Sequence, residues 1–388
     1  MTIYRRMGKW LTVCMLCVFA AGCSGPAHVP AAAPEQERIL QTEAAPETEP
    51  VVIEQESGPA PEPDDEVIQQ RTESDGMVHS YLTGELVPSA QGNRRPLAVM
   101  MSNDKEAQPQ YGINRAGVVY EVPVESGMNR FMAVMEDFDG LERIGSVRSC
   151  RTYYIYFARE FDAVYAHFGQ STFARPYLKY IDNINGIEGV GGTAFYRSGD
   201  RKRPHNAYTS FAGINRAMER LGYTWSYDES YQGHFRFVAP GASVRLNGAD
   251  AREAWKVTPG YVYNRPWFEY CEDDGLYYRY QYGGPHNGDE GQIAVRNIII
   301  QYCSSGYYAT TAYRNLNVHE PSWGYFITGG QAEDITWEKD GELGVTHYYD
   351  ASGREIVLNP GKTWICVVPV NDMSPAVIEG RPESAQNG

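Results

Sequence analysis

The sequence predicts an α/β protein in two folded parts: a layered α+β domain over residues 76–238 and a separate all-β domain over residues 239–370. Two observations carry this prediction. Strand-like and helix-like patterns are interspersed from Arg95 to Tyr223, which is typical of a mixed sheet covered by helices. After Phe237 helical spacing disappears, and runs rich in Tyr, Ile, Val and Trp follow one another between turn signals.

The expected elements of the first domain follow from two periodicities. Short apolar runs that end in polar residues predict buried strands, and apolar residues three and four positions apart predict helices. The expected strands are 96–103, 116–125, 130–137 and 163–169. The expected helices are 152–161, 172–184 and 211–223.

The second domain is expected to contain strands alone. Its strand-like segments are 267–283, 294–303, 323–330, 333–341, 344–358 and 362–370. The turn signals Asp-Asp-Gly, Asp-Gly and Ala-Ser-Gly separate several of them. The pattern predicts a barrel or sandwich of six or more strands.

The N-terminus has the features of a lipoprotein signal peptide over residues 1–22. Arg5, Arg6 and Lys9 form a positive region, a short apolar stretch follows, and Ala-Ala-Gly precedes Cys23. This order resembles the lipobox of bacterial lipoproteins, in which the cysteine receives a diacylglyceryl group. An ordinary secretory signal with a chance cysteine is the alternative. Because two acyl chains hold a protein on a membrane, we expect a lipid anchor at the outer face of the cytoplasmic membrane, facing the cell wall.

Residues 23–75 are expected to form an acidic, proline-rich tether. They contain eight prolines, and 13 acidic residues against Arg38 and Arg71. Such a segment cannot bury enough apolar surface to offset the entropy of ordering it. Residues 371–388 are expected to form a flexible tail. No second apolar run reaches 18 residues, so the sequence predicts no transmembrane helix.

Four cysteines lie in the two folded domains, namely Cys150, Cys271, Cys303 and Cys366. Export permits disulfides, three pairings are possible, and Cys271 and Cys303 are the first candidates because they flank a hairpin-like stretch. No Cys-x-x-Cys pair or Cys/His cluster suggests zinc, and we expect no metal and no cofactor. His286 and Asp289 are too few ligands to indicate a metal site, so a turn is the favoured interpretation there.

Polar residues embedded in apolar strands, or placed near their ends, form the candidate ligand site. They are Asn103, Arg130, Arg148, Arg151, His167, Arg197, His205 and Asn206. Arginine suits bidentate capture of carboxylate or phosphate, and histidine can donate hydrogen bonds or move protons. A helix that begins near Ser149 would add its N-terminal amides to an anion site. The alternative is structural pairing of these arginines with acids such as Glu121, Glu125 and Asp162.

Several classes of function find no support. The sequence contains no P-loop, His-Glu-x-x-His or Gly-x-Ser-x-Gly motif. The isoelectric point is about 5.1, and the one dense cation run is Arg201–Arg203, so binding to nucleic acid is not expected. Many of the 29 tyrosines could stack on sugar rings, but cross-strand aromatic pairs explain most of them.

A series of segments resembles the YerB-like family of bacterial lipoproteins, a class of unknown function. The segments are RPLAVMMSN, YGINRAGVVYEVPVESGMNRFMAV, IGSVRSCR, DAVYAHFGQS, RKRPHNAYT, YYRYQYGGPHNGDEG, AVRNIIIQY and LNPGKTWICVVP. The resemblance covers nearly all of residues 80–370. It implies a two-domain extracytoplasmic lipoprotein with a layered α/β first domain and a β-rich second domain.

The resemblance implies no catalytic residue. Positions that match the family pattern include Arg148, Arg151, His167, Arg197, His205 and Asn206. Two positions depart from it: Cys150 stands where a small residue is usual, and Gly117 stands where an acidic residue is usual. If that acid contributes to catalysis in the family, this chain lacks it.

Three functions compete. The favoured one is binding of an anionic cell-envelope component, such as peptidoglycan, a teichoic acid or a lipid-linked precursor, through the Arg/His set. The second is interaction with cell-wall synthesis enzymes through the β domain. The third is a transferase or hydrolase of phosphate-linked glycans, which would need a divalent metal and acids near the arginines; Glu121 and Glu125 are the candidates. Whether the protein is an enzyme stays open.

Overall fold

The computed structural model describes residues 67–68 and 71–382 of the 388-residue chain. The expected signal peptide, the expected lipidation site Cys23 and most of the expected tether lie outside the described residues. In the part that is described, no helix combines the length and the apolar character needed to cross a membrane.

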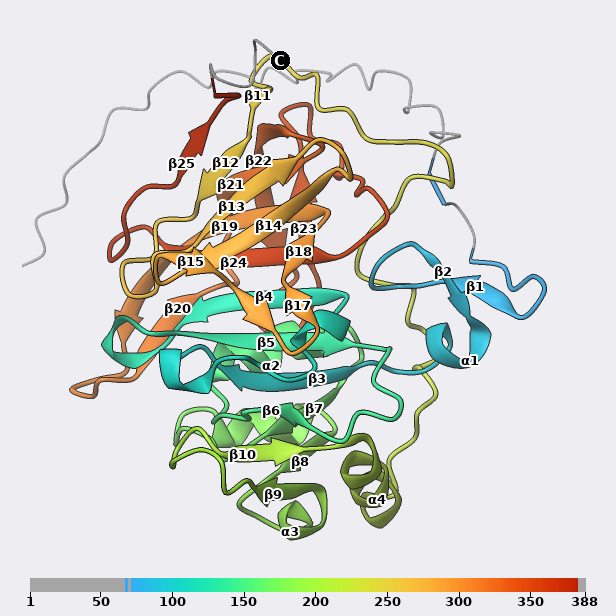
Figure 1. Ribbon diagram of the computed structural model, residues 1–388, viewed down its shortest axis with the longest axis vertical. Helices are drawn as coiled ribbons and strands as arrows, with labels where there is room; N and C mark the ends of the chain where they lie inside the picture. Colours follow the sequence, from blue (N-terminus) through green and yellow to red (C-terminus); the bar gives the residue numbers. More distant parts are fainter. Residues whose placement is uncertain (1–66, 69–70, 383–388) are drawn as a thin grey trace, which may run out of the picture. The chain divides into compact units, whose positions relative to one another are not determined.

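A twelve-stranded mixed sheet runs through both halves of the described chain (Figure 1). Its order is β11-β22-β21-β19-β24-β4-β5-β3-β7-β8, with β20 paired to β19 and β23 paired to β22. The strands from the first half are β3 Leu97–Ser102, β4 Val118–Pro123, β5 Asn129–Met135, β7 Val164–His167 and β8 Asn183–Asn185. The strands from the second half are β11 Arg252–Glu253, β19 Asn297–Tyr307, β20 Arg314–Asn317, β21 Ser322–Thr328, β22 Gln331–Lys339, β23 Thr346–Tyr349 and β24 Thr363–Pro369.

Smaller sheets complete the fold. A six-stranded sheet contains β12 Lys256–Thr258, β13 Trp267–Cys271, β14 Leu276–Gln281, β15 Gly284–Pro285, β18 Ala294–Val295 and β25 Val377–Glu379. A three-stranded sheet contains β6 Ile144–Gly145, β9 Phe195–Arg197 and β10 Ala207–Thr209. The two-stranded sheets are β1 Met77–His79 with β2 Leu86–Pro88, and β16 Asn287–Gly288 with β17 Gly291–Gln292.

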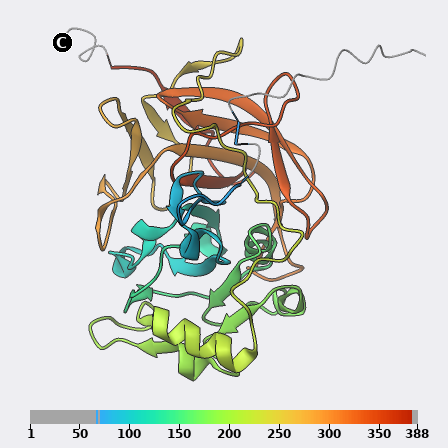
Figure 2. The same ribbon diagram turned by 90° about the vertical axis from the view of Figure 1, so that its right-hand side faces the viewer.

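The described helices are α1 Ser89–Gly92, α2 Thr152–Arg159, α3 Gly191–Ala194 and α4 Phe211–Leu221. The hydroxyl of Ser210 caps α4 by accepting a hydrogen bond from the Gly213 N–H at 3.1 Å. Figures 1 and 2 place α3, α4, β9 and β10 together beyond β8.

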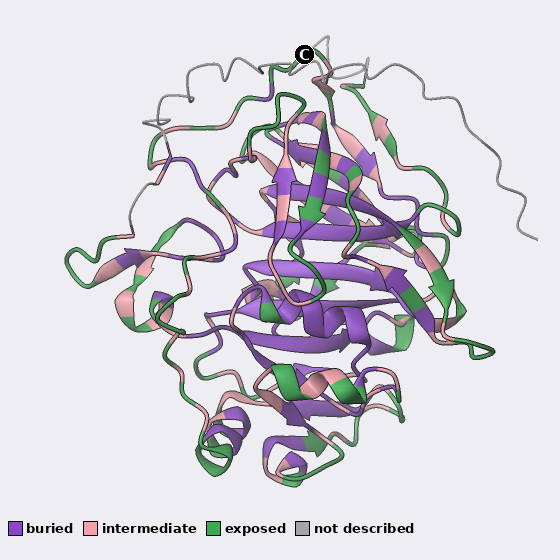
Figure 3. Ribbon diagram, turned by 180° about the vertical axis from the view of Figure 1, so that it is seen from behind, coloured by how far each residue is buried: buried purple, intermediate pink, exposed green. Residues whose placement is uncertain are grey.

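The central strands are buried on both faces (Figure 3). On β3, Val99 and Met101 join one hydrophobic cluster, whereas Met100 joins a second cluster on the opposite face. Helix α2 packs within this second cluster, where Phe157 stacks on Tyr120 with ring centroids 4.4 Å apart. Because helices or further strands cover both faces, these strands appear in the sequence as continuous apolar runs.

Both expected fold classes are confirmed: a layered α/β first half and a β-rich second half. The structure adds that one sheet joins the two halves. Strand β24 pairs in parallel with β4, with Thr363 opposite Val118, and the described residues all belong to one compact unit.

The helix expected over residues 172–184 is wrong. The structure has a 3₁₀ helix at Arg175–Tyr180 followed by strand β8. The side-chain amide of Asn183 donates to the carbonyls of Leu178 and Ile181, both at 3.1 Å, which ends the helical turn. Tertiary pairing of β8 with β7 then takes the chain into the sheet.

The expected disulfide is also wrong. Cys150, Cys271, Cys303 and Cys366 are all free thiols. Cys271 ends β13 in the six-stranded sheet, whereas Cys303 is buried in β19 of the large sheet. The stretch between them does contain antiparallel hairpins, β14 with β15 and β16 with β17. The two cysteines stay unpaired because β13 and β19 belong to different sheets.

Parts of the expected tether and tail are ordered. Val67 forms a β-bridge with Val238, and the Arg71 guanidinium lies 4.0 Å from the centroid of the Tyr81 ring. In the expected tail, β25 pairs with β12. The composition of these segments did not indicate the partners that order them.

Candidate functional site

Three arginines come together at the carboxyl end of β3, beside the start of α2. Arg130 of β5 pairs in register with Ser102, the last residue of β3. On the other side of β3, the Arg148 N–H donates to the Met100 carbonyl at 3.0 Å. Arg151 is the N-cap residue of α2. The sheet therefore assembles the three side chains from separate segments.

Arg151 is held in an ion pair. Its Nε and Nη2 donate to the two carboxylate oxygens of Glu125 at 2.6 and 2.5 Å, and its Nη1 donates to the Cys150 carbonyl at 2.8 Å. Burial raises the pKa of Glu125, but the hydrogen bonds and charge of Arg151 outweigh it, so this pKa lies below its usual value. Arg151 therefore fits the alternative in which an arginine of this set pairs with an acidic side chain of the same chain and binds no ligand.

Arg130 and Arg148 have no such partner. Arg130 is 7% exposed and donates to the Ser149 carbonyl at 2.6 Å. Burial, followed by the charges of Arg151 and Arg148, lowers the pKa of Arg130 to about 10. Burial also lowers the pKa of the half-buried Arg148, although the charge of Asp104 opposes this shift. The Nη1 of Arg148 finds no hydrogen-bond partner among the described residues.

We call Arg130, Arg148, Arg151 and Glu125 the arginine cluster. It holds three guanidinium groups and one carboxylate, and that carboxylate is engaged by Arg151. Cations buried beside one another lower each other's pKa when too few anions are present. The cluster therefore has the charge and the free donor of an anion-binding site.

A polar row lies beside Arg148. The Ser102 hydroxyl donates to Asp104 at 2.7 Å, and the Nδ1 of His205 lies 3.4 Å from the Ser102 Oγ and 3.5 Å from Asp104. A serine–histidine–acid relay needs the two partners on opposite ring nitrogens, so this arrangement is not a relay. Burial lowers the pKa of His205 despite the charge of Asp104.

The structure separates the other expected site residues from the cluster. His167 is fully buried and contacts the Gly169 carbonyl at 2.8 Å. Burial lowers its pKa. Arg197 donates to the Asn206 side chain at 2.7 Å, across the pairing of β9 and β10. Among the described residues, no side-chain hydrogen bond or ion pair joins these three residues to the arginine cluster.

Asn103 lies next to the row in sequence but does not join it. It follows Ser102, the last residue of β3, and no hydrogen bond joins its side chain to Ser102, Asp104 or His205. Its side chain is 2% exposed, and neither of its polar atoms has a partner among the described residues. Its carbonyl accepts a hydrogen bond from the Tyr282 hydroxyl at 2.8 Å.

The second half also contributes to the site, which the sequence did not indicate. The Tyr313 ring lies 5.2 Å from the Arg151 guanidinium, and Arg314 donates to the Val124 carbonyl at 3.2 Å. Both belong to the β19–β20 hairpin. Only the shared sheet brings this hairpin to the arginine cluster.

Glu121, an expected partner of the arginines, lies instead in a fully buried network between the two halves. It accepts from Arg279 at 2.7 Å, and further hydrogen bonds come from Asn129, Asn264 and Trp364 at 2.9, 2.9 and 3.1 Å. Every acceptor direction of this carboxylate faces a donor. The network joins β4 and β5 of the first half to β14 and β24 of the second.

His286 extends this network, and its neighbours fix its protonation. Its Nδ1 accepts from Arg279, because a guanidinium only donates. Its Nε2 therefore carries the proton and donates to the Gln110 side chain at 2.9 Å. Burial and then the charge of Arg279 hold its pKa well below the usual value. The turn interpretation of this loop fits, and the described residues contain no group of three potential ligands for a metal ion.

Acidification is expected to destabilise the protein through His286. Below a pH of about 6.5 the unfolded chain binds a proton at this histidine while the folded chain does not, so stability falls by about 1.4 kcal/mol per pH unit. At pH 5 the loss is about 2 kcal/mol. Urea unfolding at pH 7.5 and pH 5 should show a loss of stability that is about 2 kcal/mol smaller in His286→Gln than in the wild type. A loss remains in the variant because other buried histidines, such as His167 and His234, also have a lowered pKa. Equal pH dependence in both proteins would contradict the neutral buried state.

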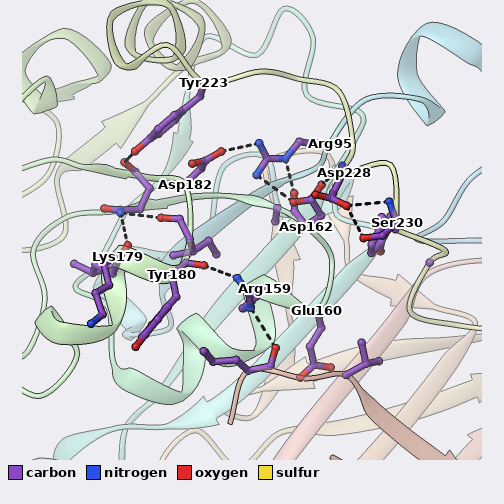
Figure 4. Close-up of a pocket in the computed structure, with 18 of the residues that line it drawn as sticks. Arg95, Arg159, Glu160, Asp162, Lys179, Tyr180, Asp182, Tyr223, Asp228 and Ser230 are labelled. Carbon is purple, nitrogen blue, oxygen red and sulfur yellow. Dashed lines mark hydrogen bonds and ion pairs between the residues drawn. The ribbon is translucent and has the colours of Figure 1, made fainter. Parts of the chain in front are cut away.

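A cavity of about 1040 Å³ opens elsewhere, lined mostly by the first half and also by Leu343 and Val345 of the second, and none of the eight expected site residues lines it (Figure 4). Arg95 lies between Asp162 and Asp182, with nitrogen–oxygen distances of 3.3 and 2.7 Å. Glu160 also lines the cavity and binds the buried amine of Lys339. Most of the polar side chains drawn in this cavity already form hydrogen bonds or ion pairs with other residues of the protein.

The comparisons with known proteins identify relatives. Residues 82–224 and 257–365 match the models described as "Protein of unknown function (DUF3048)", N-terminal and C-terminal domain. The chain is 28% identical over 297 residues to the Bacillus subtilis (strain 168) protein named "Putative lipoprotein YerB", which covers 74% of this chain and 85% of that protein. It also matches the crystal structure of YerB from Bacillus subtilis with a TM-score of 0.66 and 28% identity, over 77% of this chain and 99% of that one. The chain belongs to the YerB-like, DUF3048 family.

Proposed function

We propose that this protein is a lipid-anchored binding protein that holds a phosphate- or carboxylate-bearing component of the cell envelope at its arginine cluster. The observation that carries the proposal is the unpartnered Nη1 of Arg148, in a cluster where three guanidinium groups share one carboxylate. The charges of Asp104 and Glu125 act on Arg148, but neither acid forms an ion pair with it among the described residues, and an unsatisfied donor that is shielded from water is costly. A bound anion would remove that cost.

The proposed location rests on the N-terminus. The positive region, the short apolar stretch and the Ala-Ala-Gly-Cys sequence predict lipidation of Cys23. The similar Bacillus subtilis protein is named a putative lipoprotein. An anchor of this kind would present the folded part to anionic polymers at the outer face of the cytoplasmic membrane. Peptidoglycan, a teichoic acid and a lipid-linked precursor all carry suitable anions.

The test compares two arginines with different expected roles. Arg148→Gln should weaken binding of the full chain to purified cell-wall sacculi about 10- to 100-fold, because charge-assisted hydrogen bonds contribute about 1.5–3 kcal/mol. Its melting temperature should stay close to that of the wild type. Arg151→Met should instead lower the melting temperature, because it leaves Glu125 without its partner.

Two controls complete the design. Arg197→Gln removes an exposed arginine outside the cluster and should bind like the wild type. Sacculi stripped of teichoic acids distinguish the wall polymers from peptidoglycan. Unchanged binding by Arg148→Gln, with wild-type stability, would refute the proposed site.

A further inference from the structure

A second cavity, of about 330 Å³, is lined by residues from both halves of the chain. It lies at the amino ends of β4, β24 and β19, which run parallel to one another in the large sheet. Thr363, the first residue of β24, pairs with Val118 of β4 and with Asn297 of β19. We call this space the amino-end cavity, and its lining includes Glu85, Val119, Val295, Arg296, Lys362 and Trp364.

Two cations in this lining have no ion pair among the described residues. The Arg296 N–H donates to the Lys362 carbonyl at 2.9 Å, which holds the two residues side by side. The amine of Lys362 donates to the Asn114 carbonyl, and Nη1 of Arg296 donates to the Gly275 carbonyl at 2.9 Å. Because an ammonium has three N–H groups and a guanidinium has five, most of these donors have no acceptor in the described part of the chain.

The lining carries a net positive charge. Its charged residues are Arg296, Lys362 and Glu85, and Glu85 is exposed. Burial lowers the pKa of Lys362, although the charges of Glu85 and Glu290 oppose this shift. A ligand with a single negative charge balances two cations and one carboxylate, and it favours the charged form of Lys362.

The remainder of the lining is mostly apolar. Val119, Val295 and Trp364 are buried side chains of this kind. The indole N–H of Trp364 donates to Glu121 at 3.1 Å, so this ring offers carbon surface and no free donor. An apolar lining with a few polar groups is typical of small-molecule sites, whose volumes are about 300–1,000 Å³. The amino-end cavity has the size of the smaller ones.

We propose that the amino-end cavity binds a small amphipathic carboxylate, with its carboxylate on Lys362 and Arg296 and its apolar body against Trp364. An inorganic anion would bind the cations but leave the apolar lining in contact with water. A neutral apolar molecule would leave the cations without an acceptor. The arginine cluster lies at the other end of β4, where Val122 pairs with Arg130, so the inference goes beyond the proposed function.

The experiment separates the charge of the ligand from its apolar body. Calorimetry on the full chain measures binding of phenylacetate, of the neutral phenylacetamide, and of acetate, which has the charge but no ring. The wild type should bind phenylacetate about 10- to 100-fold more tightly than phenylacetamide, as expected for a charge-assisted hydrogen bond, and more tightly than acetate. Lys362→Met should lose most of the preference for phenylacetate over phenylacetamide, whereas Lys362→Arg should keep it.

Two further variants test the place of binding. Ala294 lines the cavity and is partly exposed, so Ala294→Trp should fill the space and weaken the binding of phenylacetate and phenylacetamide alike. Lys256→Met removes an exposed lysine outside the cavity and should bind like the wild type. Melting curves of all variants show whether they are folded.

Several results would overturn the inference. They are failure of phenylacetate to bind the wild type, equal binding of phenylacetate and phenylacetamide, acetate binding as tight as that of phenylacetate, and a preference that survives in Lys362→Met. A loss of phenylacetate binding in Arg148→Gln but not in Lys362→Met would also overturn it, because the anion would then lie at the arginine cluster. Lys362→Met should bind sacculi like the wild type, so the two proposals can fail independently.

Discussion

Arg279→Met is expected to destabilise the protein by about 3–5 kcal/mol, because it leaves the fully buried Glu121 without its counter-charge. Methionine fills much of the same space between Trp364 and Phe131, which lie 4.5 and 5.3 Å from the guanidinium, so the loss is one of charge rather than of volume. Urea unfolding at pH 7.5 measures the change. Because the network joins β4 to β14, both halves should unfold together in a single transition.

The double variant Glu121→Gln/Arg279→Met is the matched control. The oxygen of the new amide can still accept from Asn129 and Asn264, which both donate to Oε1 of Glu121, whereas Trp364, which donates to Oε2, loses its acceptor. Removing both charges avoids the cost of an unpaired one, so the double variant should regain at least half of the lost stability. Two results would contradict this account. If Arg279→Met unfolds within about 1 kcal/mol of the wild type, or if the double variant is less stable than Arg279→Met, the Glu121–Arg279 ion pair is not the main contribution to stability at this network.

Lys339→Met is expected to cost a similar amount, about 3–5 kcal/mol at pH 8. The amine of Lys339 binds Glu160, and it also donates to the Gly344 carbonyl at 2.5 Å. Both side chains of the ion pair are fully buried. Without the lysine, Glu160 keeps hydrogen bonds from the N–H and hydroxyl of Thr346, at 3.2 and 3.0 Å, and the Nδ1 of the buried His234 lies 3.2 Å from its carboxylate. Burial and then the charge of Lys339 hold the pKa of His234 well below its usual value, so this histidine does not replace the charge of the lysine.

The loss in Lys339→Met should shrink on acidification. Burial already raises the pKa of Glu160 in the wild type, and removal of the lysine charge raises it further. Between the unfolded value of about 4.5 and this folded value, the variant binds a proton on folding, so its stability rises as the pH falls. Unfolding at pH 8 and pH 5.5 measures the effect.

Lys256→Met supplies the control for an exposed pair. Lys256 and Glu379 are 44% and 51% exposed, with a nitrogen–oxygen distance of 3.3 Å, and such pairs contribute less than about 1 kcal/mol. Two results would argue against a buried charge at Glu160. One is an equal loss of stability in Lys256→Met and Lys339→Met. The other is a loss of stability in Lys339→Met that does not change with pH.

The arginine cluster could be predicted only in part. The sequence placed Arg130, Arg148 and Arg151 at the ends of apolar runs, and β3 and β5 bring them together. It also grouped His167 and Arg197 with them, because residue type says nothing about which face of a strand a side chain occupies. It could not indicate Tyr313 and Arg314, which reach the site through strand pairings between distant segments.

The sequence by itself determined the elements whose cause is local. Continuous apolar runs gave β3, β4, β5 and β24, and amphipathic spacing gave α4 with its Ser210 cap. Tertiary structure decided which strands pair. This pairing joins both halves in one sheet, places Cys271 and Cys303 in different sheets so that they stay free, and takes residues 183–185 into strand β8 instead of a helix. The reason is that hydrogen bonds of a strand are satisfied by distant segments, whereas those of a helix are satisfied within a few residues.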